Sequence, residues 1–196
     1  MSGRGASKAR VAVRIVDAAW PRALPTARAV AEQAARAALD AHAPKRRSAV
    51  EISIALADDA LLARLNRDWR GVAGATNVLS FPGTPDPGVL DAGGLGEGVP
   101  GGGPPVVLGD VALARETVTA EAAAQHKTLA AHTSHLIVHG VLHLLGHDHA
   151  TDDEAGAMEG LETCILASLG IADPYAGPRA RRPGHTNWDE AGRGSE

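Results

Sequence analysis

Four short stretches of the chain predict β-strands. In the clearest, 50–56, every second residue is apolar. This alternation places one set of side chains on a single face of the backbone, and it is typical of a strand with one buried face. Similar apolar segments predict further strands at 11–16, 77–81 and 106–113.

Longer segments carry apolar residues at the spacing of three and four that is typical of an amphipathic helix. Thr26 is a candidate N-cap for an alanine-rich helix that ends near Ala41. Asp58 stands in the same position before a second helix. The later predicted helices cover 115–126, 129–145 and 151–169, and the last opens with a capping-box pattern of Thr151 and Glu154.

The predicted order is strand, helix, strand, helix, strand, strand and then three helices. We therefore expect an α/β or α+β fold: a single domain at 10–176 with about four strands in a mixed sheet, packed with about five helices. Residues 1–9 and 177–196 are predicted to be flexible tails. The Gly- and Pro-rich segment 83–105 is predicted to be a loop insertion, because it has too few apolar residues to offset its ordering entropy.

Composition narrows the class of protein. Hydrophobic residues make up 44% of the chain and aromatic residues only 3%, so the core must be mainly aliphatic. The net charge of -4 argues against a protein that coats nucleic acid, although a local basic patch can still bind RNA. The single cysteine, Cys164, excludes an internal disulfide. With no apolar signal core and no run as long as a membrane span, we expect a cytoplasmic protein without a membrane partner.

The run HGVLHLLGHDH carries the strongest chemical signal. His139 and His143 are four residues apart on a predicted helix, so their side chains lie on one face about one turn apart. Gly146 can end that helix in a left-handed turn, which lets His149 fold back as a third ligand. Three neutral imidazoles with an open fourth position are typical of a catalytic zinc site. The alternative is a set of unrelated histidines, but the spacing H-x3-H-x5-H favours a zincin-like site for one metal ion. Histidine ligands also suit other divalent ions.

The residue after His139 is Gly140, where the HExxH pattern of zinc peptidases has a glutamate. The usual peptidase base is therefore missing. Asp148 is the nearest carboxylate in sequence, and it is a tentative catalytic residue that orients His149 or acts on the metal-bound water. The alternative, that Asp148 caps a turn, stays open.

Two further histidines, His132 and His135, precede the proposed ligands on the same helix. All four helical histidines fall within about 80° of one another around the axis, but His135 lies about 6 Å along the axis from His139, too far for the same coordination shell. His135 is thus a tentative substrate-binding residue on the floor of a cleft. The alternative is that both are hydrogen-bonded structural histidines.

Several motifs of the chain are similar to those of one known family. HGVLHLLGHDH resembles the signature of the YbeY family of bacterial metal-dependent endoribonucleases. LNRDWRG at 65–71 with TNVLSFP at 76–82, LGDVALA at 108–114 and GIADPY at 170–175 are similar to further blocks of that family, in the same order. The resemblance covers roughly 11–176. Ala75 stands where the family commonly has proline, which removes no proposed ligand.

The resemblance implies one zinc ion bound by His139, His143 and His149. It implies cleavage of single-stranded ribosomal RNA, maturation of the 3′ end of the small-subunit rRNA, and ribosome quality control, with the ribosome or its small subunit as partner. It also implies a catalytic and substrate-binding role for Arg70, whose planar fork can bind phosphate oxygens and stabilise charge on phosphorus. From the residues alone, Arg70 could equally be a surface charge at a helix end.

Two rival functions remain at this stage. A zincin-type metallopeptidase would share the histidines but lacks its glutamate. A non-catalytic ribosome-assembly factor would use zinc only for folding. Within the nuclease interpretation, the attacking group is either water or the 2′-hydroxyl of the RNA. With so few aromatic residues, we expect backbone contacts to dominate RNA binding and base stacking to contribute little.

Overall fold

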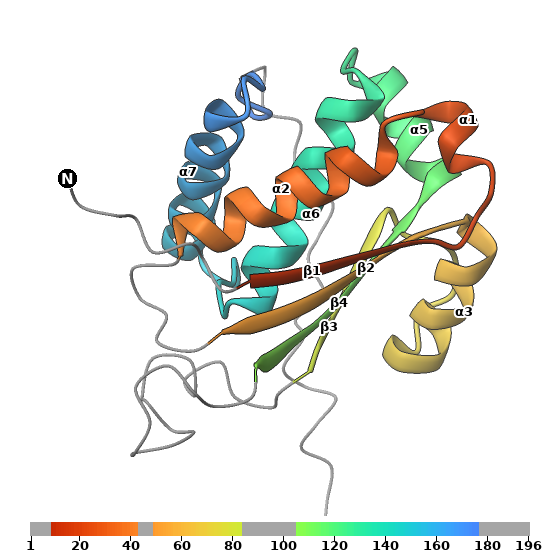
Figure 1. Cartoon of the computed structure of the whole chain (residues 1–196), viewed down its shortest axis with the longest axis horizontal. Helices are drawn as coiled ribbons and strands as arrows, with labels where there is room; N and C mark the ends of the chain where they lie inside the picture. The colour runs from red at the N-terminus through yellow and green to blue at the C-terminus, as the bar shows by residue number, and fades with distance from the viewer. Residues whose placement is uncertain (1–8, 43–48, 84–104, 177–196) are drawn as a thin grey trace, which may run out of the picture.

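The computed structural model describes residues 9–42, 49–83 and 105–176. Its centre is a four-stranded sheet in the order β1-β2-β4-β3 (Figure 1). The first three of these strands are parallel, and β3 pairs antiparallel with β4 at one edge. This confirms the predicted mixed sheet. The strands are β1 (Ala9–Ile15), β2 (Val50–Ala57), β3 (Val78–Pro82) and β4 (Val106–Ala114).

Helices cover both faces of this sheet (Figure 1). Those in the described ranges are α1 (Trp20–Ala23), α2 (Ala27–Ala41), α3 (Asp59–Arg70), α5 (Arg115–Ala124), α6 (Leu129–Leu144) and α7 (Asp152–Ser168). The predicted order of strands and helices is confirmed, with one addition. The short helix α1 was not predicted because four residues are too few to show a periodicity. Its Trp20 is fully buried and donates from Nε1 to the carbonyl of Ala57 at 2.8 Å.

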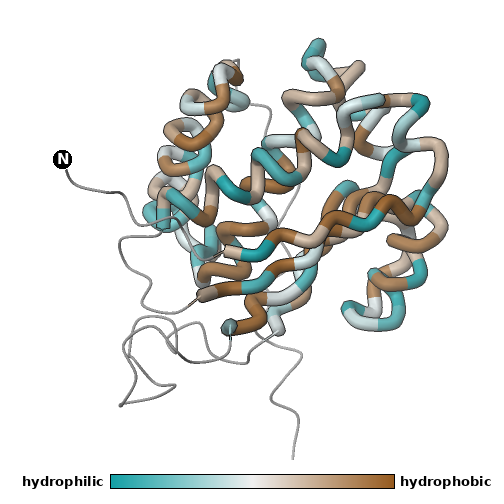
Figure 2. The backbone as a smooth tube through the Cα atoms, in the orientation of Figure 1, coloured by the Kyte–Doolittle hydropathy of each residue, from teal (hydrophilic) through white to brown (hydrophobic). Residues whose placement is uncertain are grey.

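The main core lies on the face covered by α2 and α6, and α7 packs against both of these helices. The alternating residues of β2 (Val50, Ile52, Ile54 and Leu56) are fully buried in this core, as the period-two pattern predicts. A smaller apolar cluster on the opposite face joins α3 to β3 and β4 through Leu62, Leu79 and Ala112. Figure 2 shows apolar residues along much of the central strands, whereas the helices alternate between apolar and polar positions.

Most of the predicted helix ends are confirmed by their hydrogen bonds. The Asp58 side chain accepts from the backbone N–H of Leu61, and Thr151 and Glu154 form both halves of a capping box. Gly146 has φ +89°, the left-handed conformation expected where α6 gives way to the turn before His149. Thr26 occupies the N-cap position of α2 as predicted, but its side chain makes no capping hydrogen bond.

Strand β4 carries a bulge where it meets β2. Glu51 pairs with Val107 and Ile52 with Gly109, which leaves one residue of β4 without a partner in β2. Gly109 has φ +136°, and a Cβ there would lie 2.1 Å from the carbonyl oxygen of Phe81. Glycine is therefore required for β3 and β4 to pair at this point.

The predicted tails and loop fall almost wholly outside the described residues. Of 1–9 and 83–105, only the end residues belong to the described ranges, and none of 177–196 does. Their assignment stays a prediction. No helix within the described ranges is long and apolar enough to cross a bilayer.

Candidate metal centre

Helix α6 and the turn after it bring three histidines together. His139 and His143 lie one turn apart on α6, and the turn at Gly146 returns the chain so that His149 faces them. Each offers a ring nitrogen, and these nitrogens all lie within 4.8 Å of one another. This is the arrangement predicted from the spacing H-x3-H-x5-H, and such a group could hold a metal ion.

The distances within the group suit a small divalent ion. Nε2 of His139 and Nε2 of His143 are 3.1 Å apart, and the centres of their rings are 4.6 Å apart. Two nitrogens each about 2.0–2.1 Å from one tetrahedral zinc would be separated by about 3.3 Å. The His149 ring centre is 4.8 Å from that of His143 and 5.5 Å from that of His139. The donor set is therefore compatible with zinc, although its geometry does not single out zinc among divalent ions.

The electrostatic environment keeps His143 neutral. Burial, and then the neighbouring rings of His139 and His149, lower the pKa of the His143 imidazole to about 4. At neutral pH the ring therefore has a lone pair available. A neutral imidazole is the form that binds a metal ion.

A buried carboxylate, Glu162 of α7, adjoins the group and was missed in the sequence. Its side chain is 1% exposed, and its Oε1 accepts from Nδ1 of His139 at 2.8 Å. Burial alone would raise the pKa of Glu162, but hydrogen bonds from His135 and His139 outweigh burial and hold it well below the ordinary value. A signal was present in the sequence. Glu162 is the one acidic residue among the buried positions of α7, the others being Ala155, Met158, Ile165 and Leu166.

The two histidines that precede the group are both paired with carboxylates. His132 is 3% exposed, and its Nε2 lies 2.8 Å from Oε2 of Glu121. This is the arrangement of a hydrogen-bonded structural histidine. Nε2 of His135 lies 3.1 Å from Oε2 of Glu162, and the His135 side chain is 14% exposed. Substrate binding by His135 stays a prediction.

Asp148 lies beside His149 without a strong contact to its ring. One of its carboxylate oxygens accepts from the backbone N–H of His149 at 2.8 Å and lies 3.9 Å from the ring Nδ1. The first contact stabilises the turn, and the second is too long for a hydrogen bond. Both predicted roles of Asp148, in the turn and toward the metal, therefore stay open.

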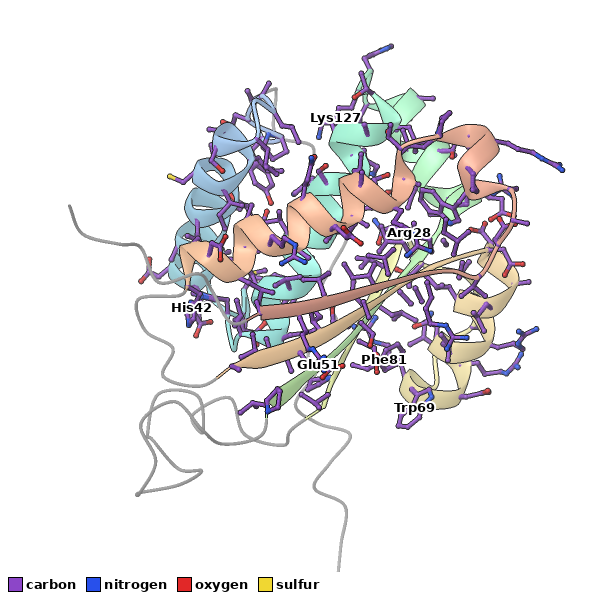
Figure 3. The ribbon with its side chains drawn as sticks, in the orientation of Figure 1. Arg28, His42, Glu51, Trp69, Phe81 and Lys127 are labelled. Atoms are coloured by element: carbon purple, nitrogen blue, oxygen red, sulfur yellow. The ribbon has the colours of Figure 1, made fainter. Side chains whose placement is uncertain are left out.

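Arg70 is the last residue of α3, directly before the left-handed cap at Gly71. Burial lowers the pKa of its guanidinium to about 10, so it remains charged at neutral pH. On the same turn the Trp69 ring contacts Phe81 of β3 edge to face, with ring centres 5.9 Å apart (Figure 3). The catalytic role of Arg70 is not tested by these contacts.

Strand β3 lies between the end of α3 and the histidine helix. Phe81 faces α3, whereas the neighbouring Ser80 faces α6 and donates from its hydroxyl to the carbonyl of Gly140 at 3.1 Å. The TNVLSFP segment thus contacts both the LNRDWRG helix and the HGVLHLLGHDH helix. Three blocks that are distant in sequence meet at this edge of the sheet.

Gly140 has a packing role of its own. A Cβ at this position would lie 2.9 Å from Oγ of Ser80 and 2.9 Å from Cγ1 of Val111. The helix face at residue 140 is therefore pressed against β3 and β4. Any side chain in this place, including the glutamate of zinc peptidases, would require Ser80 and Val111 to shift.

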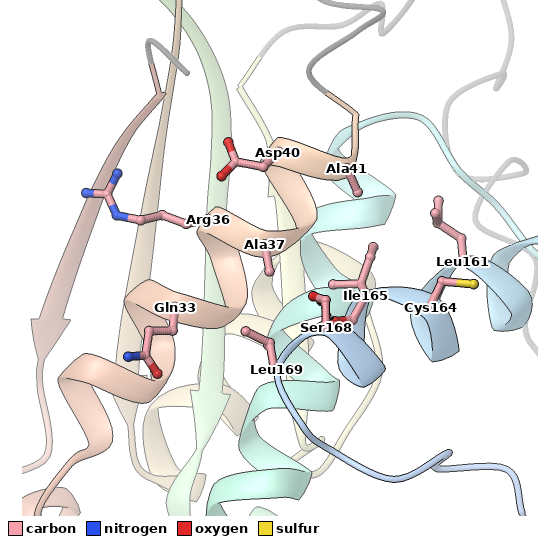
Figure 4. Close-up of a pocket in the computed structure, with 10 residues that line it drawn as sticks. All are labelled: Gln33, Arg36, Ala37, Asp40, Ala41, Leu161, Cys164, Ile165, Ser168 and Leu169. Carbon is pink, nitrogen blue, oxygen red and sulfur yellow. Dashed lines mark hydrogen bonds between the residues drawn. The ribbon is translucent and has the colours of Figure 1, made fainter. Parts of the chain in front are cut away.

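A separate hollow lies between α2 and α7 (Figure 4). It contains none of the predicted metal-binding or catalytic residues. Its lining includes Gln33, Arg36 and Asp40 from α2 and Cys164, Ile165 and Ser168 from α7.

Comparison with known proteins gives a consistent result. The family model described as Endoribonuclease YbeY matches residues 21–170. A protein of Paramagnetospirillum magneticum named Endoribonuclease YbeY is 54% identical over 165 residues, covering 84% of this chain and 94% of its own length. One of Rhodospirillum rubrum with the same name is 50% identical over 175 residues, covering 87% of this chain and 83% of its own. The solution structure of a Thermotoga maritima protein aligns with 89% of this chain at 16% identity and a TM-score of 0.47, too low to support any conclusion.

The family model matches most of the chain, and the two relatives are about half identical to it over 94% and 83% of their own lengths. The resemblance inferred from the sequence motifs is thereby confirmed. This chain belongs to the YbeY family of endoribonucleases.

Proposed function

We propose that this protein is a zinc-dependent endoribonuclease that cleaves single-stranded RNA. One zinc ion would be held by His139, His143 and His149. The observation that carries this proposal is the convergence of three imidazole nitrogens within 4.8 Å in a chain of the YbeY family. The relatives are named as endoribonucleases, and the name supplies the type of bond that is cleaved.

The residues of the site would have separate roles in metal binding, phosphate binding and proton transfer. The three histidines would hold the ion through their ring nitrogens. When bound, the zinc supplies a Lewis acid and increases the acidity of water toward a pKa of about 7. Arg70 would bind the phosphate oxygens and offset the charge that develops on phosphorus. Asp148 is the candidate for accepting a proton, because its carboxylate adjoins His149.

Single-stranded RNA is the expected substrate. The deep, narrow major groove of an A-form duplex prevents side chains from reaching its bases, so we expect the site to act on an open strand. By family membership we propose ribosomal RNA as the natural substrate, with a role in maturing the 3′ end of the small-subunit rRNA and in ribosome quality control. We also propose that the protein acts in the cytoplasm, with the small ribosomal subunit as its partner.

The experiment that tests this function compares substrates with the metal as the variable. Purified protein is incubated with an unstructured RNA, the same RNA annealed into a duplex, and casein, each with and without a chelator. We expect cleavage of the unstructured RNA only, and loss of that cleavage with the chelator. Cleavage of casein would support the peptidase instead, and undiminished RNA cleavage in chelator would contradict the metal-dependent mechanism.

A further inference from the structure

We propose that Glu162 is a positioning residue of the metal centre, and that Tyr175 holds it in place. Glu162 would fix the ring of His139 so that Nε2 faces the ion. This inference rests on the metal site of the proposed function, but not on RNA cleavage. Neither residue was among the site residues predicted from the sequence.

Contact with Glu162 determines the tautomer of the His139 ring. An ionised carboxylate only accepts hydrogen bonds, so the Nδ1 that lies 2.8 Å from Oε1 of Glu162 must carry a proton. In a neutral imidazole the lone pair is then on Nε2. That is the atom 3.1 Å from Nε2 of His143, on the side where the three rings converge. Glu162 thus selects the form of His139 that can bind a metal ion.

Both oxygens of the Glu162 carboxylate have hydrogen-bond partners. Oε2 of Glu162 lies 3.1 Å from Nε2 of His135 and accepts from the Tyr175 hydroxyl. Together with His139, these give the buried carboxylate three donors. A buried charge is tolerated when it is fully hydrogen-bonded in this way. Hydrogen bonds at both carboxylate oxygens therefore fix the position of Glu162. Through Glu162 they also fix the orientation of the His139 ring.

Tyr175 comes to the site from a segment that two hydrogen bonds hold in place. It lies in the segment that follows α7, and its backbone N–H donates to Oδ1 of Asp173 at 2.8 Å. Nζ of Lys127 donates to the carbonyl of Pro174 at 3.0 Å. This bond connects the segment to the residue directly before the N-cap of α6. The DPY residues near the end of the domain thereby become part of the support of the metal centre.

The chain also contains a matched control. Nε2 of His132 on α6 lies 2.8 Å from Oε2 of Glu121 on α5, the same separation as between His139 and Glu162. His132 is not among the three histidines that could hold an ion. If removing the carboxylate partner of any histidine on α6 lowered zinc affinity, the loss would appear in both pairs. An effect on metal binding through His139 would appear only at Glu162.

The test measures zinc affinity by competition with a chromophoric chelator in wild type, Glu162→Leu, Glu162→Gln, Tyr175→Phe and Glu121→Leu. We expect Glu162→Leu to bind zinc about 10- to 100-fold more weakly. Glu162→Gln keeps one acceptor oxygen and should fall between wild type and Glu162→Leu. Tyr175→Phe should weaken binding less than Glu162→Leu, and Glu121→Leu should stay within about twofold of wild type.

Two further readouts separate positioning from general stability. In Co²⁺-substituted protein, the visible absorption bands report ligand geometry and should shift in Glu162→Leu but not in Glu121→Leu. Nitrogen NMR of the metal-free protein should show His139 protonated at Nδ1 in wild type and a tautomer mixture in Glu162→Leu.

Equal zinc affinity in wild type and Glu162→Leu would overturn the inference while leaving the metal site intact. An equal loss in Glu121→Leu would overturn it as well. If Glu162→Leu does not fold, Glu162→Gln decides, and wild-type affinity in that variant contradicts the inference. If wild type itself binds no zinc, the metal site fails first, so the two failures are distinguishable.

Discussion

The hydroxyl of Ser80 donates to the carbonyl of Gly140 at 3.1 Å, which ties the edge strand β3 to the histidine helix α6 one residue after His139. The contact is possible because residue 140 has no side chain. It connects the TNVLSFP segment to the metal centre. The position of His139 relative to the sheet therefore depends on close packing at one glycine.

Gly140→Ala should destabilise the protein by about 1–3 kcal/mol, because the added methyl group meets Ser80 and Val111 in a packed interface. Gly160→Ala is the control on α7, where a Cβ would meet nothing within 4 Å. There alanine should stabilise the fold by about 0.5–1 kcal/mol, because it is the better helix former. Urea unfolding of both variants measures the two effects. Stabilisation by Gly140→Ala as well as by Gly160→Ala would show that residue 140 is not constrained by packing.

Removing the metal should abolish RNA cleavage without unfolding the domain. The core is built from aliphatic residues on both faces of the sheet and does not include the three histidines. We expect His143→Ala to retain its far-UV circular dichroism and to lose turnover. Bound zinc should still raise the stability of wild type, by about 2.7 kcal/mol when free zinc is 100 times its Kd. A domain that melts on chelation would instead favour an assembly factor that needs zinc to fold.

Arg70→Ala should weaken the binding of single-stranded RNA and its cleavage. If Arg70 contacts one phosphate, the slope of log affinity against log salt concentration should become shallower by about 0.7. Arg67→Ala is the control, since its side chain is 63% exposed and pairs with Asp68 on the same helix. Filter binding across a salt series measures both slopes. An unchanged slope and an unchanged cleavage rate in Arg70→Ala would remove Arg70 from the proposed site.

The ion pair between Asp17 and Arg115 should make part of the stability depend on pH. Nε of Arg115 lies 2.6 Å from Oδ2 of Asp17. The backbone N–H of Ala19 and then Arg115 lower the pKa of Asp17 below its ordinary value of 3.8. A carboxyl group with a lowered folded pKa stabilises the protein above its unfolded pKa, and this contribution is lost as pH falls through the folded pKa.

Asp17→Asn should therefore lower the free energy of unfolding by about 1 kcal/mol at neutral pH. The difference from wild type should shrink below pH 3.8 and vanish once the pH is below the folded pKa. Asp68→Asn serves as the control, because both partners in its ion pair are more than half exposed. Unfolding curves from acid to neutral pH give the comparison. A difference between Asp17→Asn and wild type that does not change with pH would exclude the charge of Asp17 as its cause.

Local patterns were sufficient to predict most of the fold. The period of two in β2, the cap at Asp58 and the capping box at Thr151 are properties of neighbouring residues, and each appears in the structure. The three histidines were also found from local spacing, because a helix and one glycine turn determine their relation. Thr26 shows the limit, since a residue can occupy the capping position while its side chain makes no capping bond.

Contacts between distant segments could not be predicted in the same way. Glu162 lies 23 residues from His139, and Tyr175 lies 40 residues from His135. Pairing them requires the packing of α7 and the following segment against α6, which no local pattern encodes. The same holds for Ser80 and Gly140, which are 60 residues apart. What the sequence did offer was a carboxylate on the buried face of a helix, and burying a charge favours a paired role.

We propose that RNA cleavage requires one metal ion held by the three histidines. The most direct test titrates metal-free protein with zinc while the rate of cleavage of an unstructured RNA is measured. The rate should rise in proportion to bound zinc and reach its plateau at one ion per chain, whereas His139→Ala should stay inactive at the same concentrations. Full cleavage by the metal-free protein, or wild-type cleavage by His139→Ala, would contradict the claim.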